Sequence, residues 1–168
     1  AEGKLPQTSQ INVARYTEFF EDLLQKGDVL HVAFTSGQSS SVNNAYMAAA
    51  ELGEKDPYTL ASLYNNWSML MIMQKRFEET EALQKKALAI VDPYPDLVTE
   101  QATTRSNLAS TLMRRYEAEK KPELLDEAEK VLEESFVLYK KDGGRSFHYG
   151  TAMITKGDIR MWRKDYAG

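Results

Sequence analysis

A short helix pattern occurs twice in this chain, and it constrains the fold more than any other feature. Asn66-Trp67-Ser68 and Asn107-Leu108-Ala109 present an asparagine, a large apolar residue and a small residue in the same order. The two small residues are 41 positions apart, close to the length of one helical hairpin, and Gly157 follows 48 positions later. Repeats of this size predict stacked hairpins that offer an extended binding surface and seldom carry a catalytic constellation.

Helices are predicted from Pro57 onward, because apolar residues recur there at intervals of three and four. Asp56 and Pro57 are typical of a helix start, where an acidic N-cap precedes a proline. Further helices are expected at about 77–91, 97–116, 122–140 and 146–162. Prolines 93 and 95 end one of them, and the glycine pair Gly143-Gly144 ends another.

The first 54 residues follow a different pattern. Apolar residues predict an amphipathic helix over Val13 to Leu24, a short buried strand over Val29 to Phe34, and a helix from about Val42 to Leu52. A polar loop rich in serine joins the strand to the second helix, and such a loop before a helix N-terminus can hold an anion through unpaired N–H groups. The predicted fold is therefore mainly α, with helical hairpins preceded by an α-β-α segment.

Composition excludes several classes of function. The formal net charge is −4 with acidic and basic residues interspersed, which argues against a nucleic acid as partner. There is no cysteine, so disulfides and thiolate metal sites are excluded, and no motif indicates another metal or a cofactor. The longest apolar run, Met69 to Met73, is too short for a membrane span, and the first residues lack the apolar core of a signal peptide. We expect a cytoplasmic protein.

No residues form a recognisable catalytic site, so we expect a protein that is not an enzyme. The serines from Ser39 to Ser41 lack a surrounding G-x-S-x-G motif, which argues against a nucleophile. They suit either a loop that caps the following helix or a contact to a carboxylate, and the sequence leaves both open. Clustered glutamates alternate with lysines and are read as solvated helix faces with some ion pairs.

Residues 55–168 resemble the tetratricopeptide repeat (TPR) family, especially its longer members of the kinesin-light-chain type. The resemblance rests on Asn66-Trp67-Ser68 with Lys75-Arg76-Phe77-Glu78-Glu79 and Ala87-Leu88, and on Asn107-Leu108-Ala109 with Glu127-Ala128 and Leu132. It implies an α-solenoid. About seven extra residues lie around Glu117 to Pro122, and the third repeat stops at Gly168, where its second helix is expected to begin.

In TPR proteins the first helix of each hairpin lines a concave face, where asparagines hold a peptide backbone. The resemblance implies that the corresponding face here binds a protein or peptide. Its residues would be Asn65, Asn66, Met69, Met73, Thr103, Ser106, Asn107, Ser110 and Arg114. Amide side chains suit this role because each offers both a donor and an acceptor. The alternative is that Asn66 and Asn107 instead tie adjacent repeats together.

Residues 7–52 resemble a fragment of the DegV family, whose members bind fatty acids. Thr8-Ser9-Gln10 matches that family's turn, and the run from Val29 to Gly37 with Ser39 to Ser41 matches its strand and serine loop. In the family, serines and threonines of these motifs hold the lipid carboxylate. The resemblance implies that role for Thr8, Ser9, Thr35, Ser36 and Ser39.

Three hypotheses follow from these patterns. The first is a helical-repeat scaffold that binds a protein or peptide, and the second is a protein that binds a fatty-acid carboxylate. The third is a recombinant chimera without an evolved function, because two family-like fragments meet without a linker after residues 1–54. We also expect a homo-oligomer, since both incomplete ends of the chain would expose surface that a second copy could cover.

Overall fold

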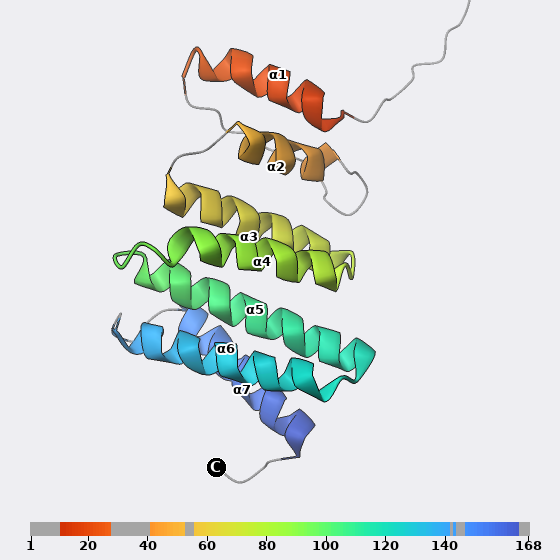
Figure 1. Cartoon of the computed structure of the whole chain (residues 1–168), viewed down its shortest axis with the longest axis vertical. Helices are drawn as coiled ribbons and strands as arrows, with labels where there is room; N and C mark the ends of the chain where they lie inside the picture. The colour runs from red at the N-terminus through yellow and green to blue at the C-terminus, as the bar shows by residue number, and fades with distance from the viewer. Residues whose placement is uncertain (1–10, 28–40, 53–55, 142, 144–146, 165–168) are drawn as a thin grey trace, which may run out of the picture. The chain divides into compact units, whose positions relative to one another are not determined.

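The computed structural model describes residues 11–27, 41–52, 56–141, 143 and 147–164. The mainly helical class is confirmed, because these residues are almost entirely helical and include no strand. The helices are α1 (Val13–Leu24), α2 (Ser41–Glu51), α3 (Pro57–Met73), α4 (Phe77–Val91), α5 (Val98–Glu119), α6 (Pro122–Lys141) and α7 (Phe147–Arg163) (Figure 1). The contacts among them divide the chain into two units, Ala1–Glu54 and Lys55–Gly168.

The first unit contains α1 and α2, which pack against each other. Asn12 caps α1, because its Oδ1 accepts a hydrogen bond of 2.9 Å from the backbone N–H of Arg15. The small core consists of Tyr16, Phe20, Ala45 and Ala48. Phe19 belongs to the apolar stripe expected from the sequence, but the structure leaves it 53% exposed. The strand expected over 29–34 and the serine loop lie outside the described residues.

The second unit opens with α3, whose start agrees with the sequence. The Asp56 carboxylate accepts hydrogen bonds from the backbone N–H and the hydroxyl of Thr59, at 2.8 and 2.6 Å. These bonds hold the pKa of Asp56 below its usual value. Pro57 occupies the first helical position, where it loses no hydrogen bond because that N–H has no partner within the helix.

Helix α5 extends further than its apolar pattern predicts. The pattern ends near Tyr116, whereas the helix continues to Glu119. Of the residues that interrupt the predicted repeat, 117–119 lengthen α5, two residues join it to α6, and Pro122 begins α6. Contacts to other side chains support this additional turn: Arg115 pairs with Glu119 at 2.8 Å, and the Lys120 ammonium lies 4.2 Å from the centre of the Trp162 ring in α7.

Helices α3 to α7 form successive hairpins. Helix α3 packs on α4, and α5 packs on α6. Helix α5 also contacts α3, α4 and α7, so neighbouring hairpins are joined mainly through it (Figure 1). Helix α7 packs against both α5 and α6.

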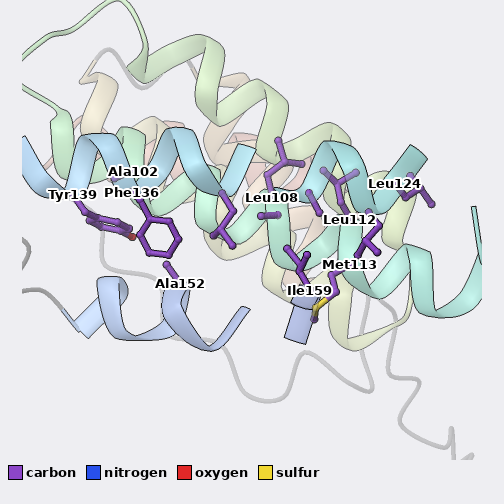
Figure 2. Close-up of a cluster of buried hydrophobic side chains, with 13 residues drawn as sticks. Ala102, Leu108, Leu112, Met113, Leu124, Phe136, Tyr139, Ala152 and Ile159 are labelled. Atoms are coloured by element: carbon purple, nitrogen blue, oxygen red, sulfur yellow. The ribbon is translucent and has the colours of Figure 1, made fainter. Parts of the chain in front are cut away.

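The main core of this unit lies where α5, α6 and α7 meet (Figure 2). Leu112 of α5 and Leu132 and Tyr139 of α6 are almost completely buried. Ala152 and Ile159, seven residues apart in α7, close the core from that helix. One face of α7 is thus buried against the preceding hairpin, as an amphipathic helix requires.

Three lysines follow the ends of α3, α5 and α7 in a left-handed backbone conformation. Their φ angles are 59° at Lys75, 55° at Lys120 and 58° at Lys164. Lys75 lies seven residues after the small residue Ser68, and Lys164 lies seven residues after Gly157. Helix α7 therefore ends with the same kind of turn, at the same position, as α3 does before α4.

Replacing Lys75 with glycine is expected to raise the free energy of unfolding by about 0.5 kcal/mol. The left-handed conformation costs an L-residue roughly 1–2 kcal/mol, and glycine avoids this cost. Glycine also loses more backbone entropy on folding, which offsets about 0.5–1 kcal/mol of the gain. Urea denaturation followed by circular dichroism measures the change. Lys120→Gly is the matched comparison and should gain less, because it removes the contact with Trp162. A clear loss of stability in Lys75→Gly would show that this turn is not strained.

Candidate functional site

One side of α3 exposes large apolar residues next to an amide. Met69 is 64% exposed and Met73 is 66% exposed. Asn66 is also exposed, and intervals of three and four residues place all three on one side of the helix. Flexible methionine side chains adapt to varied apolar surfaces, so this side of α3 has the composition of a contact surface.

The corresponding positions of α5 are Asn107, Ser110 and Arg114. Arg114 is exposed and Asn107 is half-buried. The Ser110 hydroxyl lies 2.9 Å from the hydroxyl of Thr155 in α7, so it takes part in the contact between hairpins. Of the three, Arg114 is the most accessible to a partner.

Asn65 joins α3 to α5. Its Nδ2 donates a hydrogen bond of 2.8 Å to the hydroxyl of Thr104, which is completely buried. The sequence leaves open for Asn66 and Asn107 whether they hold a peptide or tie repeats together, and it assigns Asn65 to the peptide-binding face. The structure shows Asn65 in a bond between two helices, and the Ser110–Thr155 contact is a similar bond between α5 and α7.

Thr103 and Ser106 lie inside the α5/α6 hairpin. The Tyr139 hydroxyl donates a hydrogen bond of 3.3 Å to the Thr103 Oγ1. Ser106 is only 4% exposed and also bonds Tyr139, whose pKa is raised by burial. Both residues therefore take part in the packing of α5 on α6.

An ionic cluster that the sequence did not single out connects α4 to α5. Arg115 binds the Glu81 carboxylate at 2.5 Å, and Lys85 binds its other oxygen at 2.6 Å. The side chains of Arg115 and Glu81 are each only 14% exposed. Burial opposes ionisation of Glu81, but the bonds from Lys85 and Arg115 outweigh it and lower its pKa. The four-residue spacing of Glu81 and Lys85 is visible in the sequence, whereas the contribution of Arg115 is not.

The five hydroxyl residues of the DegV resemblance lie outside the described residues. They are Thr8, Ser9, Thr35, Ser36 and Ser39. The described part begins again at Ser41, the first residue of α2, so this helix N-terminus follows the serine loop directly in the chain. Among the described residues no group of histidine, aspartate or glutamate side chains could hold a metal ion, and no helix there could cross a bilayer.

Comparison with known proteins identifies relatives of the N-terminal part. A family model described as "Uncharacterised protein, DegV family" matches residues 1–78. The N-terminal part of this chain is DegV-like. A DegV domain-containing protein of Clostridium perfringens (strain 13 / Type A) is 42% identical over 57 residues, which are 33% of this chain and 20% of that protein. No solved structure matches the chain.

These matches cover only part of the chain and a small part of the relative. The chain spans about a fifth of the length of the curated DegV relative that it matches. The family match covers the DegV motifs and continues through α3 to Glu78, the second residue of α4. It therefore crosses the boundary between the two units, and the exposed residues of α3 belong to both the DegV-like region and the predicted repeat region.

Proposed function

We propose that the DegV-like part of the chain binds a fatty acid through its carboxylate, in a binding role without catalysis. The family match over residues 1–78 supports this, because it contains both hydroxyl-rich motifs. Hydroxyl groups donate charge-assisted hydrogen bonds to a carboxylate, and a helix N-terminus favours negative charge. The start of α2 directly after the serine loop provides such a terminus.

Oleate added to the delipidated full chain tests this function. Native mass spectrometry should show an adduct of one oleate per chain, and Ser36→Ala should weaken binding by about tenfold or more, since a hydrogen bond to a charged group contributes roughly 1.5–3 kcal/mol. Thr151→Ala, which removes an exposed hydroxyl in α7, is the control and should bind like the unmodified chain. Equal binding by Ser36→Ala, or no adduct at all, contradicts the proposal.

The exposed side of α3 favours a second candidate function, which is a TPR-like α-solenoid scaffold that binds a peptide. Asn66, Met69 and Met73 supply the first part of the surface, and Asn107 and Arg114 occupy corresponding positions on α5. The bonds of Asn65 and Ser110 between neighbouring hairpins would hold these two parts in register. The two proposals involve different residues of the sequence, so different substitutions test them.

A peptide selected on the immobilised chain from a displayed random library tests the scaffold. Asn66→Ala combined with Asn107→Ala should weaken its binding by about tenfold while the helical circular dichroism signal is kept. Val137→Ala, at an exposed position of α6, is the control and should bind normally. Loss of helicity in the double variant would instead assign these asparagines to the fold.

A further inference from the structure

Helix α7 buries little apolar surface against α5 and α6. Its buried residues are Ala152, Thr155 and Ile159, and only Ile159 has a large apolar side chain. More than half of the residues of α7 are exposed, whereas α5 and α6 each have more buried residues, including several large apolar ones. Elements with few buried apolar contacts open locally more readily than the core of a protein does. Helix α7 therefore has less apolar contact to lose on opening than α5 or α6.

Two glycines weaken α7 as a helix. Gly150 and Gly157 stand at the small positions of the predicted repeat, where α5 has the buried residues Ala102 and Ala109. A Cβ added at either glycine would meet nothing within 4 Å, so packing does not require a glycine there. Glycine inside a helix is less favourable than alanine, and a short helix without tertiary contacts is marginal in water. We therefore expect α7 to lose its helical structure whenever it leaves α5 and α6.

Aromatic side chains near both ends of α7 add to the contact. The centre of the Tyr149 ring lies 5.5 Å from that of Phe136 and 5.8 Å from that of Tyr139. The Trp162 ring packs on Tyr116 of α5 with the ring centres 5.6 Å apart. Tyr149 and Trp162 are themselves only half-buried. Phe136 and Tyr139 are 5% and 1% exposed with α7 in place, so departure of α7 would expose their rings to solvent.

Ion pairs join α7 to one side of α6. Lys156 binds Glu133 at 2.5 Å, and Arg163 binds Asp126 and Glu129 at 2.5 and 2.9 Å. The three acidic residues are three and four positions apart, so they lie along the same side of α6. All five side chains are at least 30% exposed. Ion pairs with this exposure are individually weak and are screened by salt. The attachment of α7 should therefore depend on ionic strength more than the apolar packing of α5 on α6 does.

We infer that α7 detaches from α5 and α6 by local opening, and that ionic strength controls how often it opens. Helices α5 and α6 stay packed together in the open state, because Leu112 and Leu132 lie in the core that these two helices share (Figure 2). The apolar surface that α7 covers, with Phe136 and Tyr139, then faces solvent. Helix α7 is thus a salt-sensitive cover over the core of this unit.

Hydrogen exchange of the native full chain, resolved along the sequence by mass spectrometry, tests this opening. Amides of α7 should exchange at least about tenfold faster than the slowest amides of α5 and α6, because they exchange without global unfolding. Raising sodium chloride from about 0.05 M to about 0.5 M should speed exchange in α7, relative to α5 and α6, by about fivefold. Equal protection of the three helices, or the same salt response in all of them, overturns the inference.

A double variant tests the contribution of the two glycines. Gly150→Ala combined with Gly157→Ala should slow exchange in α7 by about tenfold, because alanine stabilises the helix and fits without contact. Exchange in α5 and α6 should slow by no more than exchange in α7 does. Unchanged exchange of the α7 amides in this variant overturns the inference.

A second double variant tests the contribution of the ion pairs. Lys156→Met combined with Arg163→Met keeps the apolar stems but removes both charges that bind α6. Exchange in α7 should become faster and lose most of its response to salt. Lys130→Met combined with Lys140→Met, at exposed positions of α6 for which no ion pair is described, is the matched control and should change neither. A salt response of α7 that survives removal of Lys156 and Arg163 overturns the inference.

Discussion

Truncating Leu112 to alanine is expected to lower the free energy of unfolding by about 3 kcal/mol, the largest stability effect that we predict for a single substitution. Leu112 is 0% exposed and lies in the core shared by α5, α6 and α7 (Figure 2). Removal of its side chain loses buried apolar area and leaves a cavity that the surrounding helices fill only in part. Urea denaturation followed by circular dichroism measures the change.

Val137→Ala is the matched control, because Val137 is 57% exposed on α6 and shares none of that burial. It should change the free energy of unfolding by no more than about 0.5 kcal/mol. Similar losses in the two variants would mean that the contact of α5 with α6 and α7 does not carry the stability of this unit. An unchanged slope of the urea transition would show that both variants unfold from an equally compact native state.

Replacing Arg115 with methionine should destabilise the chain by about 2 kcal/mol near neutral pH, the second of the large effects. Methionine keeps the apolar part of the side chain but leaves the Glu81 carboxylate, which is only 14% exposed, without one of its two cationic partners. A shielded carboxylate that loses its partner keeps its desolvation cost. Lys86→Met, at an exposed position of α4 for which no ion pair is described, should have a much smaller effect.

The effect of Arg115→Met should depend on pH in a definite direction. The folded pKa of Glu81 lies below its usual 4.5, so its contribution to stability is complete above that pH and is lost as the pH falls through the folded value. The pKa of Glu119 is lowered to about 2 by hydrogen bonds from Arg115 and Lys121, so the loss continues into strong acid. The free energies of unfolding of Arg115→Met and of the unmodified chain should therefore differ less at about pH 3 than near neutral pH. If this difference did not change with pH, the effect of the substitution would come from lost packing and not from the ion pair.

The start and order of the helices could be predicted from the sequence because local chemistry decides them. An acidic cap before proline at Asp56 and the apolar intervals of each helix are properties of neighbouring residues. The end of α5 could not be predicted in this way. Its last turn is supported by the packing of Lys120 on Trp162, and the two residues are far apart in the chain.

The candidate site, too, could be predicted from the sequence only in part. Periodicity correctly places Met69 and Met73 on one side of α3, since a helix brings residues three and four apart together. It could not distinguish Asn66, which is exposed, from Asn65, which bonds Thr104 in another helix. Nor could it show that Thr103 and Ser106 face Tyr139, because rotation of α5 about its axis is set by the helices packed around it.

The sequence by itself determined that this chain is mainly helical, that small residues recur at the spacing of a hairpin, and that its N-terminal part is DegV-like. These follow from spacing along the chain and from motifs of a few residues. Only the tertiary structure decided which of the recurring small residues are covered, with Ala102 and Ala109 buried and Gly150 and Gly157 open. Burial depends on which helices lie opposite each other, and a local pattern carries no information about a neighbour distant in sequence.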